Sequence, residues 1–265
     1  MSAQPQFLQG SAGPLFCNYY AAENPRASLL LCPPFGDELN KSRRMLALLC
    51  RELQSAGCSV LHLDLHGCGD SAGEHSEARW SQWREDVFAA YHWLHASSGE
   101  SPALLGFRLG ALMALEVSEL VVASRLVLWQ PVLNGKQFIQ QFLRLRLVAG
   151  AFSGNKETAA DLRAQLDAGD VLEVAGYGLH PEFVVEVENL KVSESLSAPL
   201  SWFQLVPNVD KGLPAAQQKR LSNWQETADA ELTTVVGEQF WQTPEITEVP
   251  GLIDATVKAV MRSCG

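Results

Sequence analysis

The stretch that decides the fold is residues 104–113, Leu104-Leu105-Gly106-Phe107-Arg108-Leu109-Gly110-Ala111-Leu112-Met113. Apolar residues lead into a Gly-x-x-x-Gly turn, and a helix-forming run of small and apolar residues follows. The two glycines permit a sharp turn between a strand and a helix. At the centre of such an elbow many enzymes present a Ser, Cys or Asp nucleophile, whereas this chain holds Arg108. The stretch therefore predicts a scaffold without the atom that would attack a substrate.

Apolar runs and helix-like runs alternate on both sides of the elbow. We expect a hairpin over 7–22, strands over 26–32, 58–65, 102–105 and 125–129, and helices over 41–56, 80–95 and 111–122. Alternation with short connections predicts right-handed crossovers and a mainly parallel, doubly wound sheet covered on both faces. An elbow within such a sheet is typical of the α/β-hydrolase fold, which we predict for this chain.

The alternation stops between residues 135 and 197. This segment contains an amphipathic run at 137–149, a polar helical run at 155–168 and a stretch rich in Gly and Pro at 174–181. We interpret 135–197 as a helical cap inserted into a single domain that spans residues 1–265. Beyond it we expect strands at 200–206 and 232–236 and helices at 214–224 and 250–263.

The composition excludes several classes of protein. A formal net charge of −10 over 265 residues argues against general nucleic-acid binding and against docking on an anionic leaflet. No window approaches the roughly 18 apolar residues of a membrane span. The six cysteines stand singly, without a Cys-x-x-Cys pair, so we expect no metal site, and we expect no cofactor. Together with an N-terminus unlike a signal peptide, these features favour a cytoplasmic protein and leave its oligomeric state open.

Four loops are expected to meet above the carboxyl ends of the strands, where ligands of this fold bind. They are residues 34–38, residues 64–71, the elbow and residues 237–241. In the first loop, Phe35 or Gly36 is a candidate donor of an oxyanion-hole amide, and Leu109 directly follows the centre of the elbow. Trp241, in the last loop, is a further candidate for contact with a ligand.

The partners of a hydrolase nucleophile are not all present. The acid of a Ser-His-Asp triad normally follows the strand that ends near residue 206, and Asp210 is available there. The histidine normally follows the last strand, but no histidine comes after His180. With nucleophile and base both missing, the standard acyl-enzyme mechanism is disfavoured. His66 and His180 are most simply structural or solvated, although His66 stays a catalytic candidate because its loop reaches the site.

Two interpretations of Arg108 remain open. It fills the pocket as an inert side chain paired with Glu38, Glu238 or Asp210, because a buried arginine requires a partner. Alternatively it binds an anion, since a guanidinium at a helix N-terminus adds five donors where backbone N–H groups already favour negative charge. A cluster of Arg108, Glu38 and Glu238 also raises the option of a water activated by a carboxylate.

The densest basic stretch is Asn40-Lys41-Ser42-Arg43-Arg44. We expect Asn40 and Ser42 to cap the helix over 41–56 and the cations to lie in its solvated first turn. Because cations there oppose the helix dipole, Lys41 or Arg44 is alternatively expected to reach Glu38 or a ligand.

The motifs together carry a family resemblance. The block Pro33-Pro34-Phe35-Gly36 with Asn40–Met45, the loop Asp64–Ser71, the Gly-x-Arg-x-Gly elbow and the ending Gly237–Trp241 resemble the second subtype of exosortase A system-associated hydrolases. The resemblance implies an α/β-hydrolase fold in Gram-negative bacteria that carry an exosortase and make exopolysaccharide.

Three function classes follow from the motifs and the resemblance. The first is a hydrolase or acyl transferase of esters or thioesters that uses Arg108, Glu38, Glu238 and His66. The second is a non-catalytic binder of a small anionic ligand, held by Arg108 with Phe35, Gly36, Lys41, Leu109 and Trp241. The third is an interaction protein, without a ligand, in polysaccharide export or protein sorting.

Overall fold

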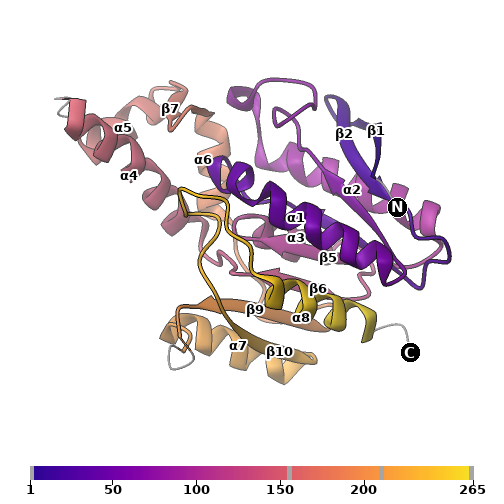
Figure 1. Ribbon diagram of the computed structural model, residues 1–265. Helices are drawn as coiled ribbons and strands as arrows, with labels where there is room; N and C mark the ends of the chain where they lie inside the picture. Colours follow the sequence, from indigo (N-terminus) through magenta and orange to yellow (C-terminus); the bar gives the residue numbers. More distant parts are fainter. Residues whose placement is uncertain (1–2, 154–156, 209–211, 263–265) are drawn as a thin grey trace.

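A sheet of eight strands forms the centre of the computed structural model, which describes residues 3–153, 157–208 and 212–262 (Figure 1). The strands lie in the order β1-β2-β4-β3-β5-β6-β9-β10. Their bounds are β1 Gln4–Gly10, β2 Gly13–Tyr20, β3 Ala27–Cys32, β4 Cys58–Leu63, β5 Ala103–Phe107, β6 Leu126–Trp129, β9 Leu200–Val206 and β10 Ala230–Val236. β2 pairs antiparallel with β1 and β4, and the other neighbours pair in parallel. The predicted α/β-hydrolase fold with a mainly parallel sheet is confirmed.

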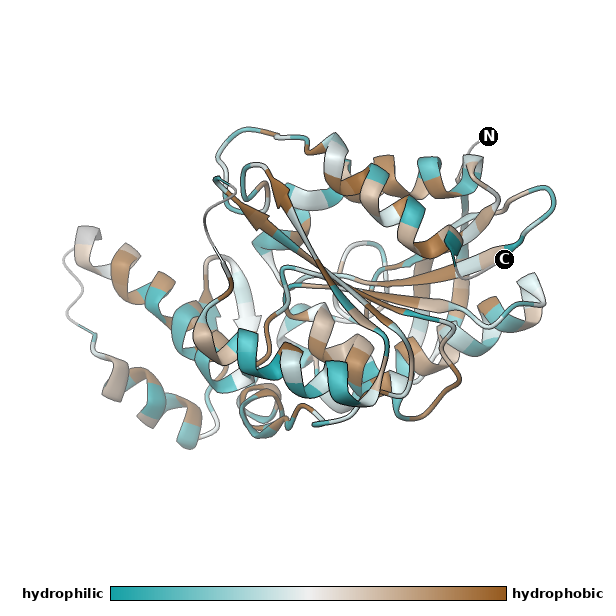
Figure 2. Cartoon of the chain, turned by 90° about the horizontal axis from the view of Figure 1, so that it is seen from below, coloured by the Kyte–Doolittle hydropathy of each residue, from teal (hydrophilic) through white to brown (hydrophobic). Residues whose placement is uncertain are grey.

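Helices cover both faces of this sheet because the residues of its parallel strands alternate between two apolar cores. On β3, Leu29 and Leu31 face one core, and Leu30 and Cys32 face the other. Helices α1 (Asp37–Ser55) and α8 (Pro250–Met261) pack on the first face, and α2 (Trp80–Ser98), α3 (Gly110–Ser118) and α7 (Ala215–Thr227) on the second. In Figure 2 the central strands are mostly brown, whereas the surrounding helices alternate teal and brown residues. The burial of both faces explains the continuous apolar runs of the strands.

The chain between β6 and β9 leaves the sheet. It forms α4 (Gly135–Ser153), α5 (Ala159–Asp167), the small hairpin β7 (Leu172–Val174) and β8 (Tyr177–Leu179), and α6 (Pro181–Asn189). A short 3-10 helix, η1 (His75–Glu77), precedes α2. Figure 1 shows α4, α5 and α6 gathered beside the start of α1. The ring of Phe35 joins this segment to the sheet, because its centroid lies 5.0 Å from that of Phe142 and 5.4 Å from that of Phe183.

The start of α1 differs from the sequence prediction. The helix begins at Asp37, so Asn40 and Ser42 lie inside it and the prediction that they cap it is wrong. Gly36, with a φ of 59°, lets the chain turn into the helix earlier than a side-chain cap would. The Ser42 hydroxyl instead donates to the carbonyl oxygen of Glu38 at 2.6 Å. The first turn therefore carries Asp37 and Glu38, whose negative charge suits the helix dipole.

Other expected elements differ mainly at their ends. The elbow helix stops at Ser118, four residues before the expected end at 122, and β4 stops at Leu63. The helix expected over 155–168 begins at residues outside the described ranges, and α5 covers its later part. No helix in the described ranges is both long and apolar enough to cross a bilayer.

Candidate functional site

The elbow after β5 keeps the geometry that its two glycines predict. A Cβ atom on Gly110 would lie 2.2 Å from the carbonyl oxygen of Cys32, and one on Gly106 would lie 2.5 Å from the Cα of Ala111. Both positions therefore exclude any side chain. Between them Arg108 has a φ of 53°, a left-handed conformation that costs a residue with a side chain about 1–3 kcal/mol. The fold thus holds a strained turn whose central side chain is a guanidinium.

Three neighbours hold the Arg108 side chain. Its Nε donates to Oε1 of Glu38 at 3.0 Å, and its Nη1 donates to the backbone oxygen of Gln130 at 3.4 Å. The guanidinium carbon lies 5.4 Å from the centroid of the Trp241 ring, within the range of a cation–π contact. Glu38, one of the three candidates, is therefore a partner of Arg108. Within the described part of the chain, Nη2 donates to no residue, which leaves two N–H groups for a ligand.

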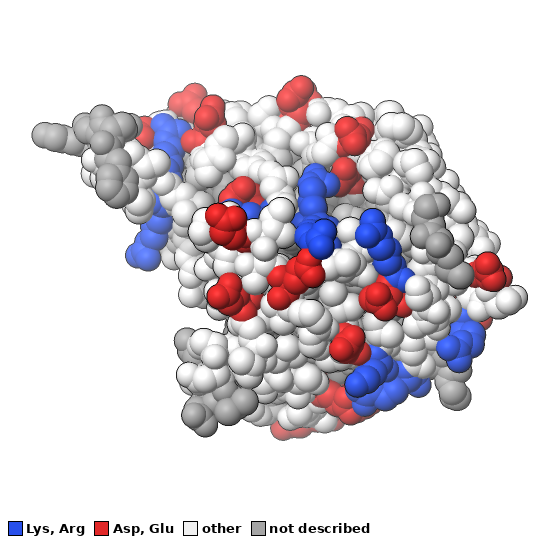
Figure 3. Space-filling view, viewed as in Figure 1, with Lys and Arg blue, Asp and Glu red and all other residues white. Residues whose placement is uncertain are grey.

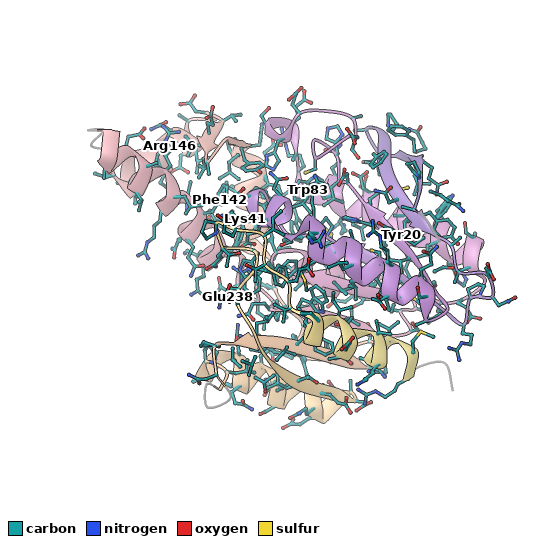
Figure 4. All side chains as sticks on the ribbon, in the orientation of Figure 1. Tyr20, Lys41, Trp83, Phe142, Arg146 and Glu238 are labelled. Atoms are coloured by element: carbon teal, nitrogen blue, oxygen red, sulfur yellow. The ribbon has the colours of Figure 1, made fainter. Side chains whose placement is uncertain are left out.

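A pocket of about 500 Å³ opens beside this guanidinium. It is lined by Phe35, Asp37, Glu38, Lys41, Arg108, Phe138, Gln141, Phe142, Leu145, Ala175, Trp241 and Gln242. Figure 4 shows Lys41 and Phe142 next to each other, where the start of α1 meets α4. The volume falls within the usual range of small-molecule sites, and a largely apolar wall with a few charged groups is typical of them.

The pocket's charges form two pairs. The Lys41 ammonium lies 3.0 Å from Oδ2 of Asp37, so Lys41 does not pair with Glu38, and Arg44 pairs with Glu248. Figure 3 shows positive and negative side chains interspersed on this face of the molecule. Desolvation raises the pKa of Glu38, and the Arg108 guanidinium opposes that rise without cancelling it. The second oxygen of this carboxylate, Oε2, is buried and has no hydrogen-bond partner among the described residues.

Four of the proposed site residues lie outside this pocket. Glu238 lines a separate hollow, where the Thr247 hydroxyl donates to it at 3.5 Å, and Figure 4 shows it below Lys41 and Phe142, in the loop after β10. His66 is 6% exposed, and its backbone oxygen accepts a hydrogen bond from the Trp83 indole. Gly36 contributes the turn into α1, and the buried Leu109 side chain lines an internal gap beneath the elbow. The structure therefore brings together Phe35, Glu38, Lys41, Arg108 and Trp241 from the predicted set.

The loop after the last strand supplies an indole where a hydrolase has its histidine. Trp241 is 1% exposed, and its Nε1 has no hydrogen-bond partner among the described residues. His180 instead caps the N-terminus of α6, where its Nδ1 accepts from the backbone N–H of Glu182 at 3.1 Å. Asp210 lies outside the described residues.

Two backbone amides, one in the loop after β3 and one in the elbow, occupy the chain positions that usually form an oxyanion hole. Within the described ranges, the N–H groups of Phe35 and Leu109 donate no hydrogen bond to the protein. Leu109 lies directly before α3, where the helix dipole favours negative charge. The elbow thus keeps its donors for a negative charge although it lacks a nucleophile.

The sequence analysis missed the residues that α4 contributes to the pocket. Phe138, Gln141, Phe142 and Leu145 all line it. The 138–142–145 spacing follows the helical i, i+4, i+7 pattern and marks one apolar stripe. That signal was present in the amphipathic run at 137–149, but it did not reveal which surface the stripe would cover.

Comparisons with known proteins agree with this architecture. A family model described as serine aminopeptidase, S33, matches residues 23–171, more than half of the chain. The solved structure of Est1E from Butyrivibrio proteoclasticus, with ferulic acid bound, has a TM-score of 0.71 and 15% identity, covering 97% of this chain and 98% of that one. A soluble variant of monoglyceride lipase from Saccharomyces cerevisiae has a TM-score of 0.68 and 11% identity, and the match covers 99% of this chain and 96% of that one. The α/β hydrolase GrgF from Penicillium sp. sh18 has a TM-score of 0.68 and 15% identity, and the match covers 100% of this chain and 99% of that one.

No curated protein matches the chain. The solved structures show the fold alone at these identities, whereas the family model covers β3, β4, β5 and β6, the elbow, and the segment after β6 as far as residue 171. The chain therefore belongs to the serine aminopeptidase S33 family of the α/β-hydrolase superfamily.

Proposed function

We propose that this protein binds a small anion with an apolar body and that Arg108 is its anchor. One observation carries the proposal: the nucleophile position is filled by a guanidinium whose Nη2 donates to none of the described residues and which lies beside a largely apolar pocket of about 500 Å³. A guanidinium presents planar, paired donors that suit a carboxylate. The walls that Phe138, Phe142 and Leu145 form suit an aliphatic or aromatic body. The pocket itself counts against a ligand-free interaction protein.

The segment 135–197 is part of this proposal as a cap over the site. Its helix α4 contributes four of the lining residues, and Phe138 and Phe142 also pack on Phe35. A cap that supplies the apolar wall would determine which ligand body fits, while the elbow binds the charged end.

Calorimetric titration with octanoate tests the proposal, with 1-octanol as its uncharged counterpart and ferulate as an aromatic acid. Ferulic acid is the ligand named for Est1E. We expect octanoate to bind and Arg108→Gln to weaken it about 10- to 100-fold, as for the loss of a hydrogen bond to a charged group. Arg163→Gln, which removes an arginine paired with Glu188 outside the pocket, is the control and should bind as the wild type does. Equal affinity for octanol and octanoate, or no effect of Arg108→Gln, would contradict the proposal.

Ester or thioester hydrolysis is the second candidate, favoured by the raised pKa of Glu38 beside Arg108. A carboxylate of raised basicity can take a proton from water, and the guanidinium can stabilise the oxyanion that forms. A panel of p-nitrophenyl esters and acyl-CoA thioesters tests it. Turnover that Glu38→Gln abolishes would establish this candidate, and a complete lack of turnover would remove it.

We further propose that the chain is the exosortase-associated subtype and acts in the cytoplasm of bacteria that make exopolysaccharide. The Asn40–Met45 block and the arginine elbow support the subtype. Cys32 and Cys50 support the compartment, since both are buried free thiols, as suits a reducing environment. Deleting the gene in its host should alter exopolysaccharide output, and Arg108→Gln should fail to restore it.

A further inference from the structure

The site has a second feature, the carboxyl group that shares Arg108 with any ligand. Glu38 occupies only Nε of the guanidinium, so an anion on Nη2 would lie on the same cation. Two carboxylates bound to one guanidinium repel each other. This repulsion raises the pKa of one of them, so the pair keeps a proton at a pH at which either carboxylate alone would be ionised.

Resting on the proposed function, we propose that the pocket takes up one proton with its anion, and that Glu38 receives this proton on Oε2. The acid ligand would then be bound as an anion beside a neutral carboxyl group. Protonation leaves one guanidinium facing one negative charge, which is the arrangement that Arg108 and Glu38 have before the ligand enters.

The geometry around Glu38 favours the protonated form. Its side chain is 20% exposed, and Oε2 is buried with no donor among the described residues, so a negative charge on that oxygen is poorly compensated. Burial already raises the pKa of this carboxyl group in the absence of a ligand. Binding would therefore add to an existing preference.

Among the residues that the structure describes, three charged groups act on Glu38. Arg108 approaches it from the elbow, and on its own helix Asp37 raises its pKa while Lys41 lowers it. The residues that α4 and the loop after β10 add to the pocket are uncharged, namely Phe138, Gln141, Phe142, Leu145, Trp241 and Gln242. Because Asp37 and Lys41 pair with each other, Glu38 is the group on which a proton would settle.

Titration of octanoate between pH 6 and 8 tests the proposal, in buffers of different ionisation enthalpy so that the heat reports protons taken up. Octanoate itself stays ionised in this range. We expect uptake of up to one proton and an affinity that falls by as much as about tenfold per pH unit as the pH rises. Glu38→Gln mimics the neutral carboxyl group, so it should bind octanoate with no proton uptake and no pH dependence. Glu188→Gln, a similarly buried partner of Arg163, should keep the wild-type behaviour.

The outcomes separate this proposal from the function on which it rests. Binding that is independent of pH in the wild type, or proton uptake that persists in Glu38→Gln, overturns the proton uptake and leaves the anion site intact. A lack of octanoate binding in every variant overturns both.

Discussion

Arg108 occupies a strained backbone position, so its neighbours have to hold it there. Glu38, Gln130 and the Trp241 ring do so from three separate elements. The side chains of Arg108 and Glu38 are 16% and 20% exposed, which makes this one of the less solvated ion pairs of the described chain. Removing either partner would leave a poorly solvated charge, a change that costs more than the loss of a surface pair.

At the residue scale we predict a specific pH dependence from Glu38. Its pKa is raised in the folded state, so the folded protein binds more protons than the unfolded chain once the pH exceeds about 4.5. The contribution of Glu38 to the unfolding free energy is thus complete below that pH and is lost as the pH rises through the folded-state pKa. Urea denaturation from pH 4 to 8 should show Glu38→Gln gaining stability relative to the wild type with rising pH. A constant difference between the two proteins would refute this.

The contacts of Arg108 could be predicted from the sequence only in part. Loops after parallel strands meet, so the contact between Arg108 and the 34–38 loop was predictable. The choice between Glu38 and Glu238 was not, because it depends on how each loop turns. The loop after β10 directs Trp241 to the guanidinium and leaves Glu238 in another hollow.

At the element scale the elbow depends on how closely α3 approaches the end of β3. We predict that Gly110→Ala destabilises the protein by about 3 kcal/mol, because its Cβ would overlap two backbone oxygens, those of Cys32 and Pro33, that cannot move independently of the sheet. The matched change is Gly251→Ala in α8, where the new Cβ would lie 3.7 Å from Val235.

Urea denaturation of both variants measures the difference. The unfolding free energy of Gly251→Ala should stay within about 1 kcal/mol of the wild-type value, because there is room for a methyl group at this position of α8. Similar losses in the two variants would mean that the close approach at the elbow is not the cause.

Element types were predictable because hydrophobic periodicity determines them, whereas helix starts depend on single backbone angles. Helix α1 begins at Asp37 and not at the predicted residue 41, because Gly36 adopts a φ of 59°, which the sequence permits but does not require. The segment 135–197 stood out by its loss of alternation. Its contact with Phe35 depends on packing between distant residues, so the sequence alone did not reveal it.

At the scale of the whole molecule, one buried histidine, His62, makes stability sensitive to acid. His62 on β4 is 8% exposed, and its pKa is lowered to about 4, because desolvation and, to a smaller extent, Arg43 together outweigh the opposing effect of Asp64. Below about pH 6.5 this histidine is protonated in the unfolded chain but stays neutral in the folded protein. The unfolding free energy therefore decreases as the pH falls from about 6.5 toward 4.

We predict that His62→Gln loses less stability than the wild type between pH 7 and pH 4.5, by up to about 3 kcal/mol. Unfolding in urea at both values measures this. His92→Gln, a change at an exposed histidine, should retain the wild-type loss. An unchanged loss in His62→Gln would assign the acid sensitivity to other groups.

The central claim is that the elbow presents a cation to a ligand. The ¹⁵N signals of the Arg108 side chain, assigned by their disappearance in Arg108→Gln, test it most directly during titration with octanoate. We predict that these signals shift and saturate together with the calorimetric binding curve, while those of Arg163 stay in place. Octanoate that binds without moving the Arg108 signals would contradict it.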